Sequence, residues 1–326
     1  MMPHILVAGK IHEAGVEVLK NAKGVTFDIV PDVTLASYAP LAPKANAILI
    51  RTQPLPATVI AAAAQLKIVS RHGVGYDAVD VEALSARGIP LCIVGDVNSR
   101  AVAEHTLMLM LAAARRIVAH DAACRQGNWN ERNRFDAHEL DGKTLLVMGF
   151  GRIGRRVAQL AQAFGMQVLA YDPFVQPAQV AAAGCALAPD LHVGLSQCDF
   201  VSLHLPAAKA PIMDVQAFSV IKQGAILVNA ARGELIDETA IAAALDRGQL
   251  RHAALDVLSA EPPPASHVLL NHPKVTLSPH NAGLTEECAA RMAIAAVENI
   301  LAYFAGRLNP ALVVNAACCD LGKKLG

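Results

Sequence analysis

The chain has 326 residues and carries 28 Lys plus Arg against 28 Asp plus Glu, so its formal net charge is zero. With 54% hydrophobic and 17% charged residues, the composition excludes a disordered chain, which would combine low hydrophobicity with high net charge, and the length predicts two domains. The mean hydropathy is +0.36, yet no run approaches the ~20 consecutive apolar residues of a membrane-spanning helix, and a neutral chain has no field that would gather nucleic acid.

The first third of the chain alternates short β-rich runs with helical stretches. Helices are expected to begin near Ile11, Thr34, Pro56 and Asp80, between the β-rich runs. Such alternation is typical of a parallel sheet that is covered on both faces. The predicted strands are residues 4–9, 25–30, 46–50, 67–70 and 90–94.

A second alternating series begins at Thr144, after a long predicted helix, Ser99–Val118, and a polar arm, residues 124–143. The helix end and the arm form the most basic stretch of the chain. Because the net charge is zero and no aromatic residues are interleaved with the basic ones, a solvated arm or subunit contact is favoured over a nucleic-acid patch. The predicted strands of this series are residues 144–148, 167–172, 199–205, 225–230, 253–258 and 274–280.

The last predicted helix, Leu284–Phe304, places apolar side chains on one stripe. We expect this stripe to pack on the first α/β unit, which would make that domain discontinuous. Its members are Ala293, Val297, Ile300, Leu301 and Phe304.

A glycine-rich turn follows the first strand of the second series. Gly149, Gly151 and Gly154 form a GxGxxG pattern that opens a predicted helix at Arg152. The first glycine permits a tight turn, the second lets a pyrophosphate approach the backbone, and the third brings helix and strand close together. The helix N-terminus offers free N–H groups and a partial positive charge, so the pattern predicts a dinucleotide site.

An acidic residue ends the next predicted strand. Asp172, 18 residues after Gly154, is placed to bind ribose hydroxyls and to repel a 2′-phosphate. This position favours NAD. Arg155 and Arg156 lie nearby in the sequence and keep NADP as the less favoured alternative.

Charged side chains follow the later strands, where a doubly wound sheet binds its ligands. Arg232 can hold a substrate carboxylate with its planar guanidinium and polarise the adjacent carbonyl. His280 can donate a proton as hydride reaches the carbonyl carbon, since imidazole titrates near neutral pH. Glu261, if it lies beside His280, would orient the ring. With Asp256, these residues predict one site for hydride transfer.

The remaining titratable groups favour no second chemistry. No spacing of His, Cys and carboxylates indicates a metal site. The seven cysteines show no CxxC spacing, and the first eleven residues lack the pattern of a secretory signal, so reduced thiols in a cytoplasmic protein are predicted. Four histidines are interpreted as packing or surface groups: His72, His105, His120 and His204.

Eight motifs follow one another along essentially the whole chain. They are GVGYDAVD (73–80), NSRAVAEHTLMLMLAAAR (98–115), GFGRIG (149–154), YDPF (171–174), DFVSLHLP (199–206), NAARGELID (229–237), ALDVLSAEP (254–262) and SPHNAG (278–283). This ordered series resembles the D-isomer-specific 2-hydroxyacid dehydrogenase family.

The resemblance implies a role for particular residues. Arg232 is the substrate-binding arginine, Glu261 the carboxylate that supports the histidine, and His280 the acid/base. Further substrate-binding positions are Arg51, Val74 and Gly75. The cofactor-binding positions are Gly149, Gly151, Arg152, Ile153, Gly154, Asp172, Pro206, Ala230, Asp256 and Gly283.

The resemblance also implies the domain organisation. We expect an α/β protein with two doubly wound parallel-sheet domains. A Rossmann NAD-binding domain, residues 99–284, is inserted in a discontinuous, flavodoxin-like substrate domain, residues 1–98 and 285–326. The expected assembly is a homodimer through the NAD-binding domain, with no nucleic-acid or membrane partner.

The implied function is NAD-dependent interconversion of a small 2-oxo acid and its D-2-hydroxy acid. YDPF and residues 50–56 resemble the phosphoglycerate dehydrogenase and hydroxypyruvate reductase branch. Gln53 stands where some phosphoglycerate enzymes carry a second basic residue, which weakens a phosphate-binding role. Two alternatives stay open: a D-3-phosphoglycerate dehydrogenase without a regulatory domain, as the end at Gly326 suggests, and a non-catalytic NADH-sensing protein like the corepressors that share this fold.

Overall fold

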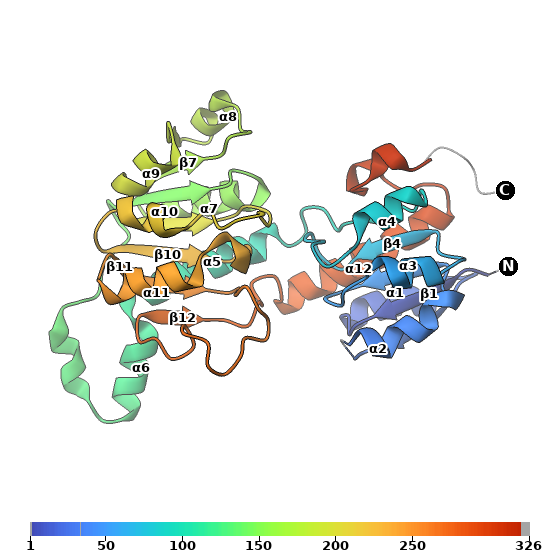
Figure 1. The fold of residues 1–326 in the computed structure, drawn as a ribbon, viewed down its shortest axis with the longest axis horizontal. Coiled ribbons are helices and arrows are strands. Elements are labelled where there is room, and N and C mark those ends of the chain that lie inside the picture. Colours follow the sequence, from blue (N-terminus) through green and yellow to red (C-terminus); the bar gives the residue numbers. More distant parts are fainter. Residues whose placement is uncertain (1, 33, 321–326) are drawn as a thin grey trace. The chain divides into compact units, whose positions relative to one another are not determined.

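The computed structural model describes residues 2–32 and 34–320, which divide into two compact units. Of these residues, unit 1 contains 2–32, 34–98 and 284–320, and unit 2 contains 99–283 (Figure 1). Each unit has its own parallel sheet with helices around it. The predicted fold class, two doubly wound parallel-sheet domains, is confirmed.

The sheet of unit 1 has five parallel strands in the order β2-β1-β3-β4-β5. This is the flavodoxin-like order, in which the direction of winding reverses between β1 and β3. The strands are β1 (His4–Ala8), β2 (Thr26–Val30), β3 (Ala47–Ile50), β4 (Ile68–Arg71) and β5 (Leu91–Cys92). The α-helices from the first part of the chain are α1 (Glu13–Asn21), α2 (Leu35–Tyr38), α3 (Ala57–Ala62) and α4 (Val81–Ala86).

Helix α12 (Glu286–Phe304) completes unit 1 from the far end of the sequence. It packs against α1, β3 and β4. Thr285 caps the helix, accepting a hydrogen bond from Cys288 N at 3.1 Å. Gly15 permits the close approach of α1, because a Cβ there would lie 2.7 Å from the Cβ of Ala293. The short helices of unit 1 are η1 (Ala39–Lys44), η4 (Pro310–Leu312) and η5 (Ala316–Cys318).

The sheet of unit 2 has seven parallel strands in the order β12-β11-β10-β9-β6-β7-β8. The order of a dinucleotide-binding sheet is extended here by one strand, and it reverses between β6 and β9. The strands are β6 (Thr144–Met148), β7 (Gln167–Tyr171), β8 (Ala186–Leu187), β9 (Phe200–Leu203), β10 (Ala225–Asn229), β11 (Leu250–Leu255) and β12 (Val275–Leu277).

Helices cover both faces of this sheet because its central strands are mostly apolar on both faces. Leu146 and Met148 of β6 pack toward α9, α10 and α11, whereas Leu145 and Val147 pack toward α5, α7 and α8. The helices of unit 2 are α5 (Ser99–Arg115), α6 (Ile117–Arg125), η2 (Trp129–Arg134), α7 (Arg152–Ala163), α8 (Pro177–Ala182), α9 (Leu191–Gln197), α10 (Val215–Val220), η3 (Gly233–Leu235) and α11 (Glu238–Asp246).

The single helix predicted over Ser99–Val118 is wrong. The chain turns at Arg116, whose φ is +50°, so that α5 ends at Arg115 and α6 begins at Ile117. The helix breaks at Arg116 because its guanidinium is held by the arm: it pairs with Asp136 and lies 3.7 Å from Glu131. These contacts lower the pKa of Asp136 to about 2, chiefly through the hydrogen bond from Arg116.

Helix α6 and the arm, residues 124–143, extend away from the sheet of unit 2 (Figure 1). Basic residues of this region pair within it, since Arg134 lies 3.0 Å from Asp136 and Arg125 lies 2.8 Å from Asp121. Within residues 2–32 and 34–320, none of the helices combines the length and apolar composition needed to cross a membrane.

Candidate active site

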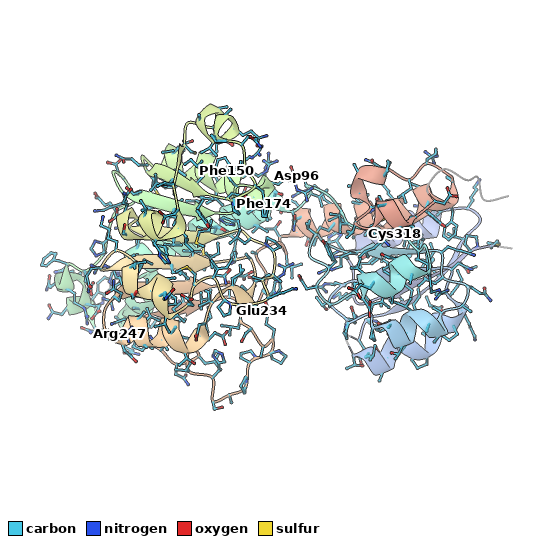
Figure 2. The ribbon with its side chains drawn as sticks, turned by 45° about the horizontal axis from the view of Figure 1, so that its top comes forward. Asp96, Phe150, Phe174, Glu234, Arg247 and Cys318 are labelled. Atoms are coloured by element: carbon cyan, nitrogen blue, oxygen red, sulfur yellow. The ribbon has the colours of Figure 1, made fainter. Side chains whose placement is uncertain are left out.

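The candidate residues of unit 2 follow the carboxyl ends of its parallel strands. In doubly wound sheets, ligands bind beyond this edge, next to the point where the strand order reverses. Phe150, Phe174 and Glu234 follow β6, β7 and β10, and Figure 2 shows them toward one side of the unit. Arg247, which follows α11, lies toward the other side.

The three glycines after β6 have different surroundings. Gly149 has a φ of +91°, and a Cβ there would lie 2.6 Å from the carbonyl oxygen of His204. A Cβ on Gly154 would lie 2.0 Å from the carbonyl oxygen of Gly149. Gly151, the N-cap of α7, has no described atom within 4 Å of a Cβ built on it. Gly149 and Gly154 therefore close the turn, while Gly151 leaves open space at the N-terminus of the helix, which fits a dinucleotide phosphate.

The first turn of α7 and Asp172 surround this space. Arg152 is exposed, and Ile153 is half-buried against the core of unit 2. Asp172 follows β7 and accepts hydrogen bonds from Phe150 N at 2.8 Å and Phe174 N at 2.9 Å. Each carboxylate oxygen keeps a second acceptor position. Asp172 thus ties the glycine turn to the loop after β7 and can still accept hydroxyl groups.

Arg155 also contacts the glycine turn. Its Nε donates to the carbonyl oxygen of Phe150 at 2.9 Å, and its guanidinium carbon lies 5.8 Å from the centre of the Phe150 ring. This arginine is therefore engaged with the backbone of the turn, which reduces its freedom to reach a 2′-phosphate.

Asp256 is buried at the end of β11, with 1% exposure. Its Oδ1 accepts from Ser278 Oγ at 2.5 Å and Asn281 N at 3.0 Å, and its Oδ2 accepts from Ala282 N at 3.0 Å. Burial alone would raise the pKa of this carboxyl, but the hydrogen bonds, including those of His105 and Ser278, outweigh it and lower the pKa. The buried group is therefore anionic.

Asp256 also fixes the position of the catalytic candidate His280. Its carbonyl oxygen accepts a hydrogen bond from His280 N at 2.8 Å. His280 has a φ of +50°, a left-handed conformation that costs a non-glycine residue about 1–3 kcal/mol. The contacts of Asp256 with residues 278–282 hold the backbone in this conformation. Gly283, half-buried, directly follows Ala282.

The structure brings Glu261 and His280 together. His280 Nδ1 lies 2.6 Å from Glu261 Oε2, and Glu261 Oε1 accepts a hydrogen bond from Leu258 N at 3.1 Å. Both side chains are partly exposed, at 53% for His280 and 37% for Glu261. With Nδ1 engaged, the other ring nitrogen, Nε2, remains for a substrate.

Arg232 follows β10, and a buried asparagine shapes its loop. Asn229 Nδ2 donates to the carbonyl oxygen of Arg232 at 2.8 Å, and Asn229 Oδ1 accepts from Ala231 N at 3.0 Å. Arg232 itself is half-buried, with Nη1 donating to the carbonyl oxygen of Ala231 at 2.6 Å. Ala230 lies in the same loop, half-buried, and Pro206 follows β9 and is exposed.

The other expected substrate-binding residues, Arg51, Val74 and Gly75, belong to unit 1. Arg51 follows β3, and its Nη1 donates to the carbonyl oxygen of Lys10 at 2.9 Å. Val74 and Gly75 lie in the loop after β4, and their N–H groups donate to no acceptor among the described residues. These N–H groups can therefore bind an anionic oxygen.

Gln53 and His72 define the surroundings of Arg51. Gln53 is 1% exposed and donates from Nε2 to the carbonyl oxygen of Asp32 at 3.1 Å, so its side chain is used inside the unit. His72 is buried, and its pKa falls to about 4 through burial and the nearby charges of Arg51 and Arg71. Two guanidinium groups thus lie at the carboxyl edge of the unit 1 sheet.

Sequence reasoning assigned no site role to three residues that hold the site in place. His105, interpreted as a packing or surface group, lies 2.9 Å from Ser278 Oγ and 3.3 Å from Asp256 Oδ1 through its Nε2. Ser278 and Asn229 were not singled out at all. Their only sequence signal is a polar residue at the end of an apolar strand, two residues before His280 in one case and three before Arg232 in the other.

Comparison with known proteins identifies the family. Residues 107–282 match the profile described as "D-isomer specific 2-hydroxyacid dehydrogenase, NAD binding domain". The chain belongs to the D-isomer specific 2-hydroxyacid dehydrogenase family. The match covers most of unit 2, so the resemblance seen in the motifs is confirmed.

Three similar proteins cover nearly all of the chain's length. D-3-phosphoglycerate dehydrogenase of Mycobacterium tuberculosis is 40% identical over 337 residues, which cover 100% of this chain and 63% of the relative. A Thermus thermophilus protein of known structure is 33% identical with a TM-score of 0.88, covering 95% of this chain and 99% of that one. D-lactate dehydrogenase of Aquifex aeolicus, solved with NAD and lactic acid, is 26% identical with a TM-score of 0.87, at 95% and 99% coverage. The chain thus spans less than two thirds of the M. tuberculosis relative.

Proposed function

We propose that the protein is an NAD-dependent oxidoreductase that interconverts a small 2-oxo acid and its D-2-hydroxy acid. The observation that carries this proposal is the 2.6 Å contact between His280 Nδ1 and Glu261 Oε2, at the same sheet edge as the glycine turn. A histidine oriented by a carboxylate is suited to proton transfer at a carbonyl oxygen. Membership of the dehydrogenase family supports the same reaction class.

In this mechanism each residue has a defined task. The Arg232 guanidinium binds the substrate carboxylate and polarises the neighbouring carbonyl. When bound at the glycine turn, NAD would supply the hydride-transfer chemistry at the carbonyl carbon. His280 gives a proton from Nε2 to the carbonyl oxygen during reduction and takes it back during oxidation. Glu261 holds Nδ1 and stabilises the protonated ring. In unit 1, Val74 and Gly75 are proposed as substrate-binding residues through their backbone N–H groups.

The proposed cofactor is NAD. The N-terminus of α7 with Gly151 would hold the pyrophosphate, and Asp172 the ribose hydroxyls. The remaining contacts come from Arg152, Ile153, Pro206, Ala230, Asp256 and Gly283. A 2′-phosphate would face the Asp172 carboxylate, and Arg155 is already bonded to Phe150, which disfavours NADP.

A phosphorylated 2-oxo acid is the second candidate substrate. The 40% identity with D-3-phosphoglycerate dehydrogenase favours it, and so do the charges of Arg51 and Arg71 beside His72. Gln53, turned inward and bonded to the carbonyl oxygen of Asp32, adds no further cation to these two arginines. The two substrate classes are separated by comparing kcat/KM for 3-phosphohydroxypyruvate with kcat/KM for hydroxypyruvate, glyoxylate and pyruvate.

The decisive experiment measures NADH consumption with this panel of 2-oxo acids. We expect turnover on at least one of them, and a His280→Gln variant should lose at least about 100-fold in kcat while binding NADH normally. His272→Gln is the matched control, because His272 pairs with Asp246 at 3.3 Å elsewhere in unit 2. Absence of turnover with NADH and NADPH, despite tight NADH binding, would support an NADH sensor and refute the enzyme.

We further propose a homodimer formed through unit 2. Apolar side chains on α5, α7 and the start of α6 line a groove of about 670 Å³, and they include Met108 at 45% and Ile117 at 55% exposure. Phe135 of the arm is 89% exposed. Contiguous exposed apolar surface of this kind marks association sites. Sedimentation should give a dimer for the protein and a monomer for Ile117→Glu; an unchanged mass for the variant would refute the interface.

The proposed location is the cytoplasm. All seven cysteines are free thiols, and Cys92, Cys185, Cys198 and Cys288 are buried. Unpaired thiols persist in a reducing compartment. Fractionation of cells that produce the protein would test this location.

A further inference from the structure

A second carboxylate of unit 2 binds the loop that carries Glu261. Glu238 is the first residue of α11, after the N-cap Asp237. Its Oε1 accepts from Ser259 N at 2.9 Å, and its Oε2 accepts from Ser259 Oγ at 2.6 Å. His267 Nε2, farther along the same loop, lies 2.9 Å from Oε2. One carboxylate therefore connects α11 to two points of the chain between β11 and β12.

This loop sets the position of Glu261. Ser259 precedes Glu261 by two residues, and Leu258 N donates to Glu261 Oε1. The loop also packs against the turn after β10, because a Cβ on Gly233 would lie 2.0 Å from the carbonyl carbon of Leu258. Movement of Ser259 would therefore displace Glu261 from His280, and it would displace Leu258 from Gly233, the residue after Arg232.

The network is built as a charged anchor. Only 18% of the Glu238 side chain and 10% of the His267 side chain are exposed. Burial would raise the pKa of Glu238, but the hydrogen bonds from Ser259 and His267 prevail and lower the pKa. Hydrogen bonds to an ionised acceptor are stronger than neutral ones, so an anionic Glu238 suits the task of fixing a loop.

We propose that Glu238 is a positioning residue that fixes the segment from Ser259 to Glu261, so that Glu261 holds the His280 ring in its productive orientation. The inference rests on the acid/base role proposed above for His280. Glu238 is not among the residues proposed to bind substrate or cofactor, and it acts through Ser259 and Glu261. Its loss would affect the proton-transfer step and leave the dinucleotide site at the glycine turn intact.

The test compares Glu238→Gln with Asp246→Asn in the full-length protein. Asp246 is the matched control, because it ends α11 and pairs at 3.3 Å with His272, which lies in the same chain segment between β11 and β12 as Ser259 and His267. Unlike the Glu238 side chain, the Asp246 side chain is exposed. The readouts are kcat and KM for the best 2-oxo acid, the Kd for NADH, the Tm, and the pH profile of reduction. Ser259→Ala removes one of the three hydrogen bonds and serves if Glu238→Gln fails to fold.

For Glu238→Gln, we expect kcat to fall on the order of 10- to 100-fold, as for a displaced catalytic group, with an unchanged Kd for NADH. The alkaline limb of reduction should move to lower pH, because Glu261 no longer holds the His280 ring. Asp246→Asn should change kcat by less than about twofold, and Glu238→Asp should recover part of the loss. Ser259→Ala should show a smaller loss of kcat in the same direction.

Two outcomes would overturn the inference. One is a Glu238→Gln variant with the kcat and pH limb of Asp246→Asn; the other is a lowered Tm with unchanged kcat and pH limb, which would mark a purely structural role. These results are separate from failure of the proposed function, which would appear as absence of turnover by the unmodified protein or as full turnover by His280→Gln.

Discussion

Two substitutions in the glycine turn should have opposite consequences, because the surroundings of Gly154 and Gly151 differ. A Cβ on Gly154 would lie 2.0 Å from the carbonyl oxygen of Gly149, whereas a Cβ on Gly151 meets no described atom within 4 Å. Gly154→Ala should therefore destabilise unit 2, and Gly151→Ala should fold normally but obstruct the approach of a dinucleotide phosphate.

The magnitudes follow from these distances. A Cβ and a backbone oxygen cannot come closer than 3.0 Å, so in Gly154→Ala the start of α7 must move by roughly 1 Å from the turn, a strain typical of overpacking that costs about 1–3 kcal/mol. For a domain of this size, this corresponds to a fall in Tm of roughly 2–12 °C. In Gly151→Ala the methyl group occupies the space proposed for phosphate, and we expect the Kd for NADH to rise at least about tenfold, or 1.4 kcal/mol.

The assay is a thermal unfolding scan of each variant without ligand, followed by titration with NADH monitored by fluorescence. The expected pattern is a lowered Tm for Gly154→Ala and a wild-type Tm with weakened binding for Gly151→Ala. A Gly151→Ala variant that binds NADH like the wild type would refute the phosphate site at this turn. An unchanged Tm for Gly154→Ala would refute the close packing of helix and strand.

Three further predictions concern acid stability, cofactor choice and the buried aspartate. Burial lowers the pKa of both His72 and His252 from 6.5 to about 4, so the unfolded chain binds more protons on acidification. The part of the unfolding free energy that depends on neutral rings should be lost as the pH falls from 6.5 toward 4, by up to about 3 kcal/mol for each ring. Urea unfolding at pH 7 and 4.5 measures this loss, and equal unfolding free energies at the two pH values would contradict it. Asp172→Ser should raise the affinity for NADPH relative to NADH at least about tenfold, and an unchanged ratio of Kd values would count against the ribose role. Asp256→Asn should lower the unfolding free energy by about 1–3 kcal/mol, because an amide NH₂ group would face buried N–H donors; wild-type stability in urea would exclude this arrangement.

Much of the fold follows from local pattern. The strand–turn–helix unit at the glycine turn lies within about 30 consecutive residues, where strand composition, turn chemistry and helix periodicity agree. The same local agreement predicts β6 at residues 144–148 and the start of α7 at Arg152, as observed. Where a distant segment intervenes, the pattern fails: α5 and α6 are separated at Arg116 by its pairing with Asp136, and no residue in the helix pattern signals this break.

The sequence by itself determined the residue types available to the site and their positions at strand ends, because a parallel sheet collects its carboxyl ends at one edge. Tertiary structure alone decided which of these residues touch. It placed Glu261 on the Nδ1 side of His280, joined His105 to Ser278 and Asp256, and turned Gln53 inward. The physical reason is that these contacts join side chains from different strands and loops, and their geometry depends on how the loops pack, which no local periodicity encodes.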